Sequence, residues 1–257
     1  MINEVQFHIN ELDLMKKYPE KLFYKGNLEL LKKPKISIIG TRRPSSYTKQ
    51  MTAKISSGLS KRGICIVSGA AMGVDSIAHQ NAQAKNTIAV MANGLNLKYP
   101  SVNKSIIESI ENNGLTLSQF EKDFRATPWS FVIRNEVVVA LGDKLIVSEA
   151  DLKSGSMRSV EFALKMQKEI FVLPHRLGES EGTNYLIKNN LAKAIYDIDE
   201  FLSNFAVENT MNDDEFLEYC KKGPSVEEAI SRYGNLVYEY ELEGKIELKN
   251  SFIIVLF

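Results

Sequence analysis

The chain has 257 residues, of which 44% are hydrophobic and 25% are charged, as in an ordinary globular protein with one large domain or a medium domain and a small one. No run of 18 apolar residues occurs, so we expect no membrane span. The first fifteen residues lack a basic and then apolar secretory pattern, and the two cysteines are too few for a disulfide framework or a zinc site. These features predict a cytoplasmic protein.

The net charge is zero, but the charges are unevenly distributed. From Lys32 to Arg62 there are nine Lys or Arg residues and no Asp or Glu. From Asp199 to Glu218 there are seven Asp or Glu residues and no Lys or Arg. Such asymmetry can create a local basic surface on a neutral protein, although solvated faces without a partner give the same pattern.

The chain divides into three parts. Residues 1–33 form an N-terminal segment with a turn signal at Lys25-Gly26-Asn27. In residues 34–206, short apolar runs alternate with helical patterns, including helices expected over 48–62 and from Ser101 to 113. The expected strands cover 36–39, 64–68, 87–91, 115–118, 144–148, 170–173 and 194–196. Continuous apolar runs are typical of parallel strands buried on both faces, so the sequence predicts an α/β fold with an extended Rossmann-type, doubly wound, mostly parallel sheet. Ligands are expected at the carboxyl ends of its strands.

Residues 207–257 predict a small winged-helix-like domain. Helices are expected over 213–222, 225–233 and 235–243, followed by a hairpin of 245–248 and 252–256 that turns at Asn250-Ser251. The third helix carries three glutamates and no Lys or Arg, which would repel DNA phosphates. We therefore expect this domain to serve protein interaction or self-association, with the acidic stretch 199–218 as a tether.

Two glycine loops follow the first two expected strands. The first reads Gly40-Thr41-Arg42-Arg43-Pro44-Ser45, and the second runs from Ser68 and Gly69 to Gly73. Glycine lets a backbone approach a phosphate, hydroxyls and arginine forks can bind its oxygens, and the helix after the loop presents its positive N-terminus. Neither loop has the dinucleotide or Walker fingerprint. The loops predict contact with a phosphate of a nucleic-acid backbone. Tight turns without a ligand remain the alternative.

Two more loops carry candidate binding residues. The loop after the fourth strand contains Lys122, Phe124 and Arg125, so a base could stack on Phe124 while the cations meet phosphates, unless Phe124 packs inward. A third glycine turn reads Lys153-Ser154-Gly155-Ser156. It could lie on the same binding surface, and its sequence fits a turn without a ligand equally well. His-x-x-x-His, Cys-x-x-Cys and Gly-x-Ser-x-Gly spacings are absent, so we predict no catalytic residue, metal or cofactor.

Several motifs, in order and spacing, resemble the signature blocks of the DNA-processing protein A (DprA/Smf) family over roughly residues 18–205. They are Gly40-Thr41-Arg42-Arg43-Pro44, Ser68-Gly69 with Gly73-Val74-Asp75 and Ala78-His79, Tyr99-Pro100-Ser101-Val102-Asn103, Leu117-Ser118-Gln119-Phe120, Arg134-Asn135, Ser154-Gly155-Ser156 and Gly182-Thr183-Asn184. The resemblance implies a dimer without a cofactor that binds single-stranded DNA in a basic pocket and loads the RecA recombinase onto DNA entering during natural transformation.

By motif, the resemblance also assigns roles to residues of this chain. Gly40, Thr41 and Arg42 would hold backbone phosphate, and Arg43 would support them. The residues Ser68, Gly69 and Gly73 would shape the neighbouring wall, and Arg134 would belong to the same site.

The chain departs from the family pattern in three places. Residues 69–75 lack the arginine of the family's usual Gly-Leu-Ala-Arg-Gly-Ile-Asp. Ala92-Asn93-Gly94 stands where the family usually has Gly-Ser-Gly, and Arg134-Asn135-Glu136 stands where it usually has Arg-Asn-Arg. These changes remove two positive charges from the expected pocket. The related nucleotide phosphoribohydrolases have a catalytic glutamate where this chain has Ser159. An enzyme of that kind and a small-nucleotide sensor are the alternative functions.

Overall fold

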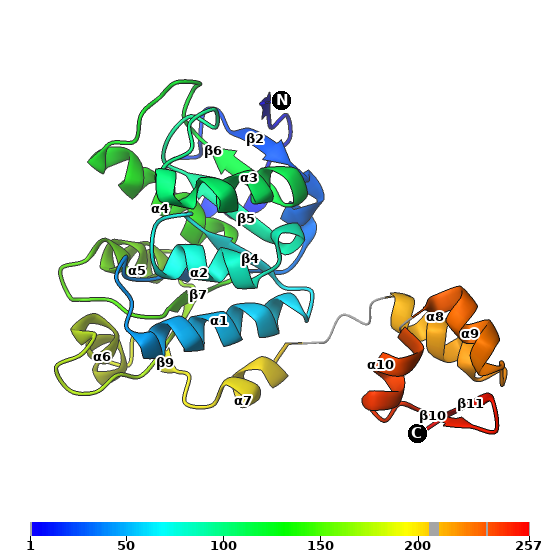
Figure 1. Ribbon diagram of the computed structural model, residues 1–257. Coiled ribbons are helices and arrows are strands. Elements are labelled where there is room, and N and C mark those ends of the chain that lie inside the picture. The colour runs from blue at the N-terminus through cyan, green and yellow to red at the C-terminus, as the bar shows by residue number, and fades with distance from the viewer. Residues whose placement is uncertain (1, 206–210, 235, 257) are drawn as a thin grey trace. The chain divides into compact units, whose positions relative to one another are not determined.

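The computed structural model of the protein describes residues 2–205, 211–234 and 236–256, with side chains in the second range described from Phe216 onward (Figure 1). The chain forms two compact units, Met1–Ala206 and Val207–Phe257. Both residues at this division, and residues 208–210 of the expected acidic tether, lie outside the described residues.

The larger unit is built on a nine-stranded sheet with the order β1-β2-β6-β5-β4-β3-β7-β8-β9. Its strands are β1 (Asn3–Glu4), β2 (Phe23–Gly26), β3 (Lys35–Ile39), β4 (Cys65–Ser68), β5 (Thr87–Met91), β6 (Leu115–Ser118), β7 (Lys144–Val147), β8 (Glu169–Val172) and β9 (Lys193–Ala194). From β3 to β9 all pairings are parallel, whereas β1 and β2 pair antiparallel. All seven expected strands are present, which confirms the predicted doubly wound, mostly parallel sheet.

Helices cover both faces of this sheet (Figure 1). They are α1 (Ser46–Ser60), α2 (Val74–Asn81), α3 (Lys104–Asn113), α4 (Pro128–Leu141), α5 (Gly155–Lys165), α6 (Glu181–Lys188) and α7 (Ile198–Ser203). The expected cap at Ser101 is wrong, because Ser101 begins a short 3-10 turn and α3 starts three residues later. No helix in the described residues is long and apolar enough to cross a membrane.

The core follows from the alternation of side chains along the central strands. In β3, Ile36 and Ile38 pack in one cluster with residues of α1, α2 and α7, while Ile39 packs in another with residues of α4 and α5. Every residue of β3, β4, β5 and β6 is buried, as in a sheet covered on both faces.

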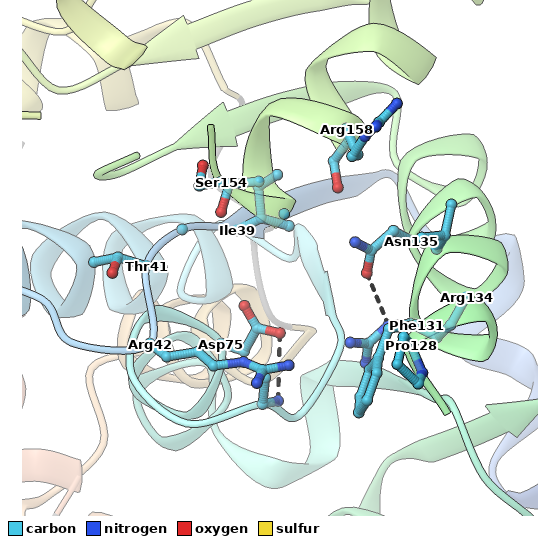
Figure 2. A pocket seen from close by; sticks show the side chains of 16 residues that line it. Ile39, Thr41, Arg42, Asp75, Pro128, Phe131, Arg134, Asn135, Ser154 and Arg158 are labelled. Carbon is cyan, nitrogen blue, oxygen red and sulfur yellow. Dashed lines mark hydrogen bonds between the residues drawn. The ribbon is translucent and has the colours of Figure 1, made fainter. Parts of the chain in front are cut away.

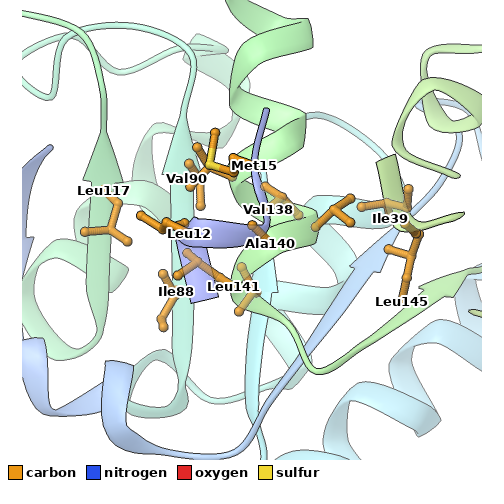
Figure 3. Packing of buried hydrophobic residues seen from close by; sticks show 14 of the residues in the cluster. Leu12, Met15, Ile39, Ile88, Val90, Leu117, Val138, Ala140, Leu141 and Leu145 are labelled. Atoms are coloured by element: carbon orange, nitrogen blue, oxygen red, sulfur yellow. The ribbon is translucent and has the colours of Figure 1, made fainter. Parts of the chain in front are cut away.

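The N-terminal segment contributes more to this core than its sequence indicated. It supplies the edge strands β1 and β2 and a 3-10 helix, Asn10–Leu14, that places Leu12 in the centre of the core. Figure 3 shows Leu12 and Met15 packed among side chains from the sheet and α4. The expected turn lies at Gly26, where φ is +103° and a Cβ would stand 2.1 Å from the carbonyl oxygen of Gly114.

The connections of the sheet reverse direction between β3 and β7. From β3 the chain proceeds through β4, β5 and β6 on one side, and it then returns to β7 and continues through β8 and β9 on the other. The loops after β3 and β7 therefore diverge at adjacent carboxyl ends. Such a switch point leaves a crevice in which α/β proteins bind ligands.

The smaller unit has the expected winged-helix-like composition. It contains α8 (Met211–Cys220), α9 (Val226–Tyr233), α10 (Leu236–Leu242), β10 (Ile246–Lys249) and β11 (Phe252–Val255). Ser225 and Glu228 form a capping box at the start of α9, and the hairpin turns where Asn250 and Ser251 have positive φ. The expected first residue of the third helix, Asn235, lies outside the described residues.

Candidate functional site

A pocket of about 460 Å³ lies at the switch point (Figure 2). Four segments line it: the loop after β3, the loop after β4 with the first turn of α2, the first two turns of α4, and the start of α5 that follows β7. Of the expected site residues, the structure places seven in this lining: Gly40, Thr41, Arg42, Arg134, Ser154, Gly155 and Ser156. These segments are far apart in sequence, and the sheet topology brings them together.

Arg42 is an exposed cation in the lining of the pocket. Its guanidinium carbon lies 5.2 Å from the centre of the Phe131 ring, which is half-buried and projects from α4. Within the described residues Arg42 has no ion pair. Arg42 and Phe131 together offer a guanidinium fork for phosphate oxygens and an aromatic surface for a base. The neighbouring Arg43 is exposed but does not line the pocket.

Glycines fix the loop that carries Arg42. A Cβ on Gly40 would lie 2.6 Å from a methyl group of Val74. Gly73 has a φ of +80°, and its Cβ would lie 2.4 Å from the carbonyl oxygen of Thr41. The amide of Val74 donates a hydrogen bond to that same carbonyl at 3.1 Å. Gly40 and Gly73 therefore allow two loops to touch, and they set the position of the Arg42 backbone.

The side chain of Arg134 is 4% exposed and lies beneath the pocket wall. One of its terminal nitrogens donates to the carbonyl oxygens of Gly69 and of Val90, the latter at 2.9 Å, and its Nε donates to Asn135 at 3.0 Å. A Cβ on Gly69 would collide with this guanidinium. Arg134 thus connects the ends of β4 and β5 to α4. The hydroxyl of Ser68, which is buried in the same layer, donates a hydrogen bond to the carbonyl oxygen of Ile38 at 2.6 Å.

Two buried ionisable groups accompany Arg134. The carboxylate of Asp75 accepts hydrogen bonds from the amides of Gly69 and Ala71 at 3.2 and 3.3 Å. Desolvation raises its pKa, and Arg134 and these hydrogen bonds oppose the rise. Burial, followed by the nearby charge of Arg134, lowers the pKa of His79 to about 3. His79 is therefore neutral at physiological pH and serves the packing of these loops.

The start of α5 forms the opposite wall. A Cβ on Gly155 would meet no atom within 4 Å, so the backbone here is open to a ligand. The Oγ atom of Ser154 is buried and has no hydrogen-bond partner in the described part of the chain. Arg158, which sequence reasoning missed, also lines the pocket, whereas Lys153 lies beside it on an adjoining depression. An anion at this helix start would meet free amides and a positive helix end.

The loop after β6 does not join the pocket. Lys122 and Arg125 are exposed, and neither lines the pocket. The Phe124 ring stacks on Phe120 with 4.5 Å between the ring centres. Phe124 therefore packs on its own loop, and the aromatic ring in the pocket is Phe131. The sequence contained a signal for Phe131, because it lies three residues before Arg134 on one face of a helix.

The chain matches the family of DNA recombination-mediator protein A over residues 3–206. It belongs to this family. It is 36% identical to DNA processing protein DprA of Streptococcus pneumoniae over 191 residues, covering 73% of this chain and 67% of that protein. It is 33% identical to protein Smf of Escherichia coli over 204 residues, covering 77% of this chain and only 54% of that protein.

Two solved structures of the family are similar to this one. DNA processing protein A from Helicobacter pylori, described as binding single-stranded DNA, has a TM-score of 0.78 and 45% identity, covering 79% of this chain and 94% of that one. The Streptococcus pneumoniae DprA structure has a TM-score of 0.73 and 33% identity, covering 80% and 74% of the two chains. These matches confirm the resemblance that the sequence motifs indicated.

Ser159, which the motif resemblance places where a hydrolase would have its glutamate, is buried in the lining of the pocket. The lining contains one carboxylate in the described residues, that of Asp75, which accepts hydrogen bonds from two backbone amides and whose pKa the charge of Arg134 lowers. No group of three His, Cys, Asp or Glu residues that could hold a metal ion occurs in the described residues.

Proposed function

We propose that this DprA-family protein binds single-stranded DNA in the pocket at the switch point. The observation that carries the proposal is the pairing of exposed Arg42 with Phe131, 5.2 Å apart, opposite the open start of α5. Arg42 and the amides of α5 hold backbone phosphates, and a base stacks on Phe131. In duplex DNA the bases are stacked on each other, so only a single strand can use the aromatic ring.

The experiment compares single-stranded and duplex DNA of equal length and sequence in gel shifts at one salt concentration. We expect tighter binding of the single strand. Equal binding of the two forms would contradict the proposed role of Phe131. Because affinity for DNA depends steeply on salt, a titration of salt completes the comparison.

The same loops would also serve a sensor of small nucleotides, which is the alternative function. A ligand that binds the folded state raises the melting temperature. We expect short oligonucleotides to raise it, and AMP or cyclic nucleotides to leave it unchanged. We also expect no release of base or phosphate from nucleotides, because Ser159 replaces the hydrolytic glutamate. Turnover that follows the protein through purification would favour the enzyme alternative.

The family membership supports a wider proposal. We infer that the protein is a cytoplasmic homodimer that protects incoming DNA and helps to load RecA during natural transformation. Two pockets in a dimer can engage one strand and gain affinity through effective concentration. Light scattering tests the dimer, and the rate at which RecA assembles on a protein-covered single strand tests the loading. A strict monomer would remove the two-pocket argument and leave the single site intact.

A further inference from the structure

A buried histidine, His175, lies next to the first turn of α1. It follows β8, and its side chain is 2% exposed. Its Nε2 atom lies 3.1 Å from the hydroxyl oxygen of Thr48 on α1 and 3.9 Å from a carboxylate oxygen of Glu149 in the loop after β7. His175 therefore lies where its own loop meets α1 and the loop after β7.

The hydrogen bonds around this ring determine which of its nitrogens carries the proton. Nδ1 lies 3.0 Å from the carbonyl oxygen of Leu173, which can only accept a hydrogen bond. Nδ1 therefore carries the hydrogen, and Nε2 accepts a hydrogen bond from the hydroxyl of Thr48. That hydroxyl in turn accepts from the hydroxyl of Ser45, the residue that caps α1. The neutral ring thus completes a chain of hydrogen bonds that begins at the cap of α1.

Groups on the other elements packed against the ring are uncharged. On α6, the hydroxyl oxygen of Thr183 lies 3.3 Å from Nδ1, and on α1 the Tyr47 ring meets the imidazole edge-on with 5.5 Å between the ring centres. Arg176 and Glu179, in the same loop as the histidine, are exposed, and neither pairs with the imidazole in the described part of the chain. Among the described residues, Glu149 is therefore the carboxylate that a charged imidazole can meet.

Glu149 connects this ring to the pocket. Its carboxylate accepts a hydrogen bond from the backbone amide of Ser45, and its backbone carbonyl accepts from the amide of Thr41, which lines the pocket beside Arg42. The carboxylate therefore lies at the end of the loop that would hold a backbone phosphate. Its negative charge opposes the binding of that phosphate.

We propose that His175 is a positioning residue through which the affinity for single-stranded DNA rises as the pH falls. This inference rests on the proposed binding of single-stranded DNA in the pocket. A proton on Nε2 turns this atom from an acceptor into a donor, and a small movement brings it within hydrogen-bond distance of Glu149. The ion pair cancels the charge of Glu149 and with it the repulsion of the phosphate. By linkage, a bound phosphate also favours the protonated ring.

The test measures the affinity for an oligothymidylate from about pH 8 to about pH 5.5, the range in which histidine side chains titrate. Fluorescence anisotropy at one low ionic strength follows the binding. We expect the affinity to rise about two- to fivefold towards the lower pH, the size of one screened repulsion. His79 stays neutral over this range because its pKa is about 3. Calorimetry in two buffers of different ionisation enthalpy should also show that binding takes up protons. Neither measurement needs a variant to fold.

Two variants then identify the groups involved. In His175→Gln the side chain still offers an acceptor to Thr48 but cannot take up a proton, so its affinity should be the same at both ends of the range. Glu149→Gln should bind tightly throughout, because a buried charged ring then lacks its partner carboxylate and does not form. His8→Gln is the matched control, since His8 is an exposed histidine that pairs with Asp13 outside the pocket. It should keep the pH dependence of the unchanged protein.

The outcomes separate this inference from the proposed function. A flat pH profile of the unchanged protein overturns the inference and leaves the proposed function standing, whereas failure to bind the strand at any pH removes the proposed function. A rise that persists undiminished in His175→Gln also overturns the inference, because another group then senses the pH.

Discussion

The backbone amide of Ser45 donates a hydrogen bond to the carboxylate of Glu149 at 3.0 Å, at the first turn of α1. The amide of Thr41 donates to the backbone carbonyl of the same glutamate at 2.8 Å. The sequence indicated that this helix would present its positive end to a phosphate, but the side chain of Glu149 already occupies it. The hydroxyl of Ser45 is used as well, because it caps α1 at Thr48. The open helix start in the pocket belongs to α5.

The Glu149→Gln variant should bind single-stranded DNA more tightly. Glutamine retains an oxygen that can accept the Ser45 hydrogen bond, while the negative charge beside the phosphate site is lost. We expect a gain of about two- to fivefold at low salt, the size of one screened repulsion at the protein surface. Fluorescence anisotropy measures it. The control is Glu29→Gln, an exposed glutamate that pairs with Lys32 and should leave affinity unchanged.

Arg42→Ala and Arg43→Ala should differ, although the two arginines are adjacent and both exposed. Only Arg42 lines the pocket, so its loss should weaken single-strand binding about tenfold or more and lower the salt slope by roughly 0.7. Arg43→Ala is the matched control and should behave nearly as the unchanged protein. Both variants should fold normally, because exposed loop cations contribute little to stability. Equal effects of the two substitutions would contradict the placement of Arg42.

Removal of Arg134 should damage the fold, unlike removal of Arg42. Arg134→Met removes the donor to the buried carbonyl oxygens of Gly69 and Val90 and the charge that lowers the pKa of Asp75, and we expect the free energy of unfolding in urea titrations to fall by about 1–3 kcal/mol for each buried group left without a partner. Adding Asp75→Asn should restore part of the loss, since the amide oxygen can still accept a hydrogen bond from a loop amide. Arg158→Met, at a side chain that is 65% exposed, is the control and should cost little.

The stability of the protein should depend on the protonation of His79. The pKa of this side chain is about 3 in the folded state, against an ordinary value of 6.5, so the unfolded chain binds a proton first as pH falls. Stability should be fully present above pH 6.5 and fall between about 6.5 and 3, with a limiting slope of about 1.4 kcal/mol per pH unit from this group. Asp75 contributes with the opposite sign, because its folded pKa is raised. Unfolding of a His79→Gln variant over the same pH range isolates the histidine, and an unchanged pH dependence would contradict the assignment.

The sequence predicted the central strands well because most are short, mainly apolar runs rich in β-branched residues, as in Thr87–Met91. It did not predict the edge strands of the N-terminal segment, because β1 has two residues and both are exposed, so no periodicity marks it. For the site, the loop residues Gly40, Thr41 and Arg42 were identified from their chemistry. Phe131 was missed although its spacing from Arg134 offered a signal, and Glu149 was missed because only the return of the chain along β7 brings it to the start of α1.

The C-terminal unit should be dispensable for single-strand binding. On α10, Glu239 and Glu241 are exposed and make no ion pair with another described residue, so this helix would meet DNA phosphates with negative charge. The exposed Leu242 and Tyr238 on the same helix, 88% and 47% accessible, suit contact with a protein instead. A chain without residues 207–257 should therefore retain affinity for single-stranded DNA within a few-fold of the full chain, measured by anisotropy at equal salt.

The unit has its own buried core, with Phe216 at 0% exposure, so the fragment 208–257 can be studied alone. Binding of duplex DNA by that fragment at physiological salt would contradict the expectation that this unit contacts protein and not DNA.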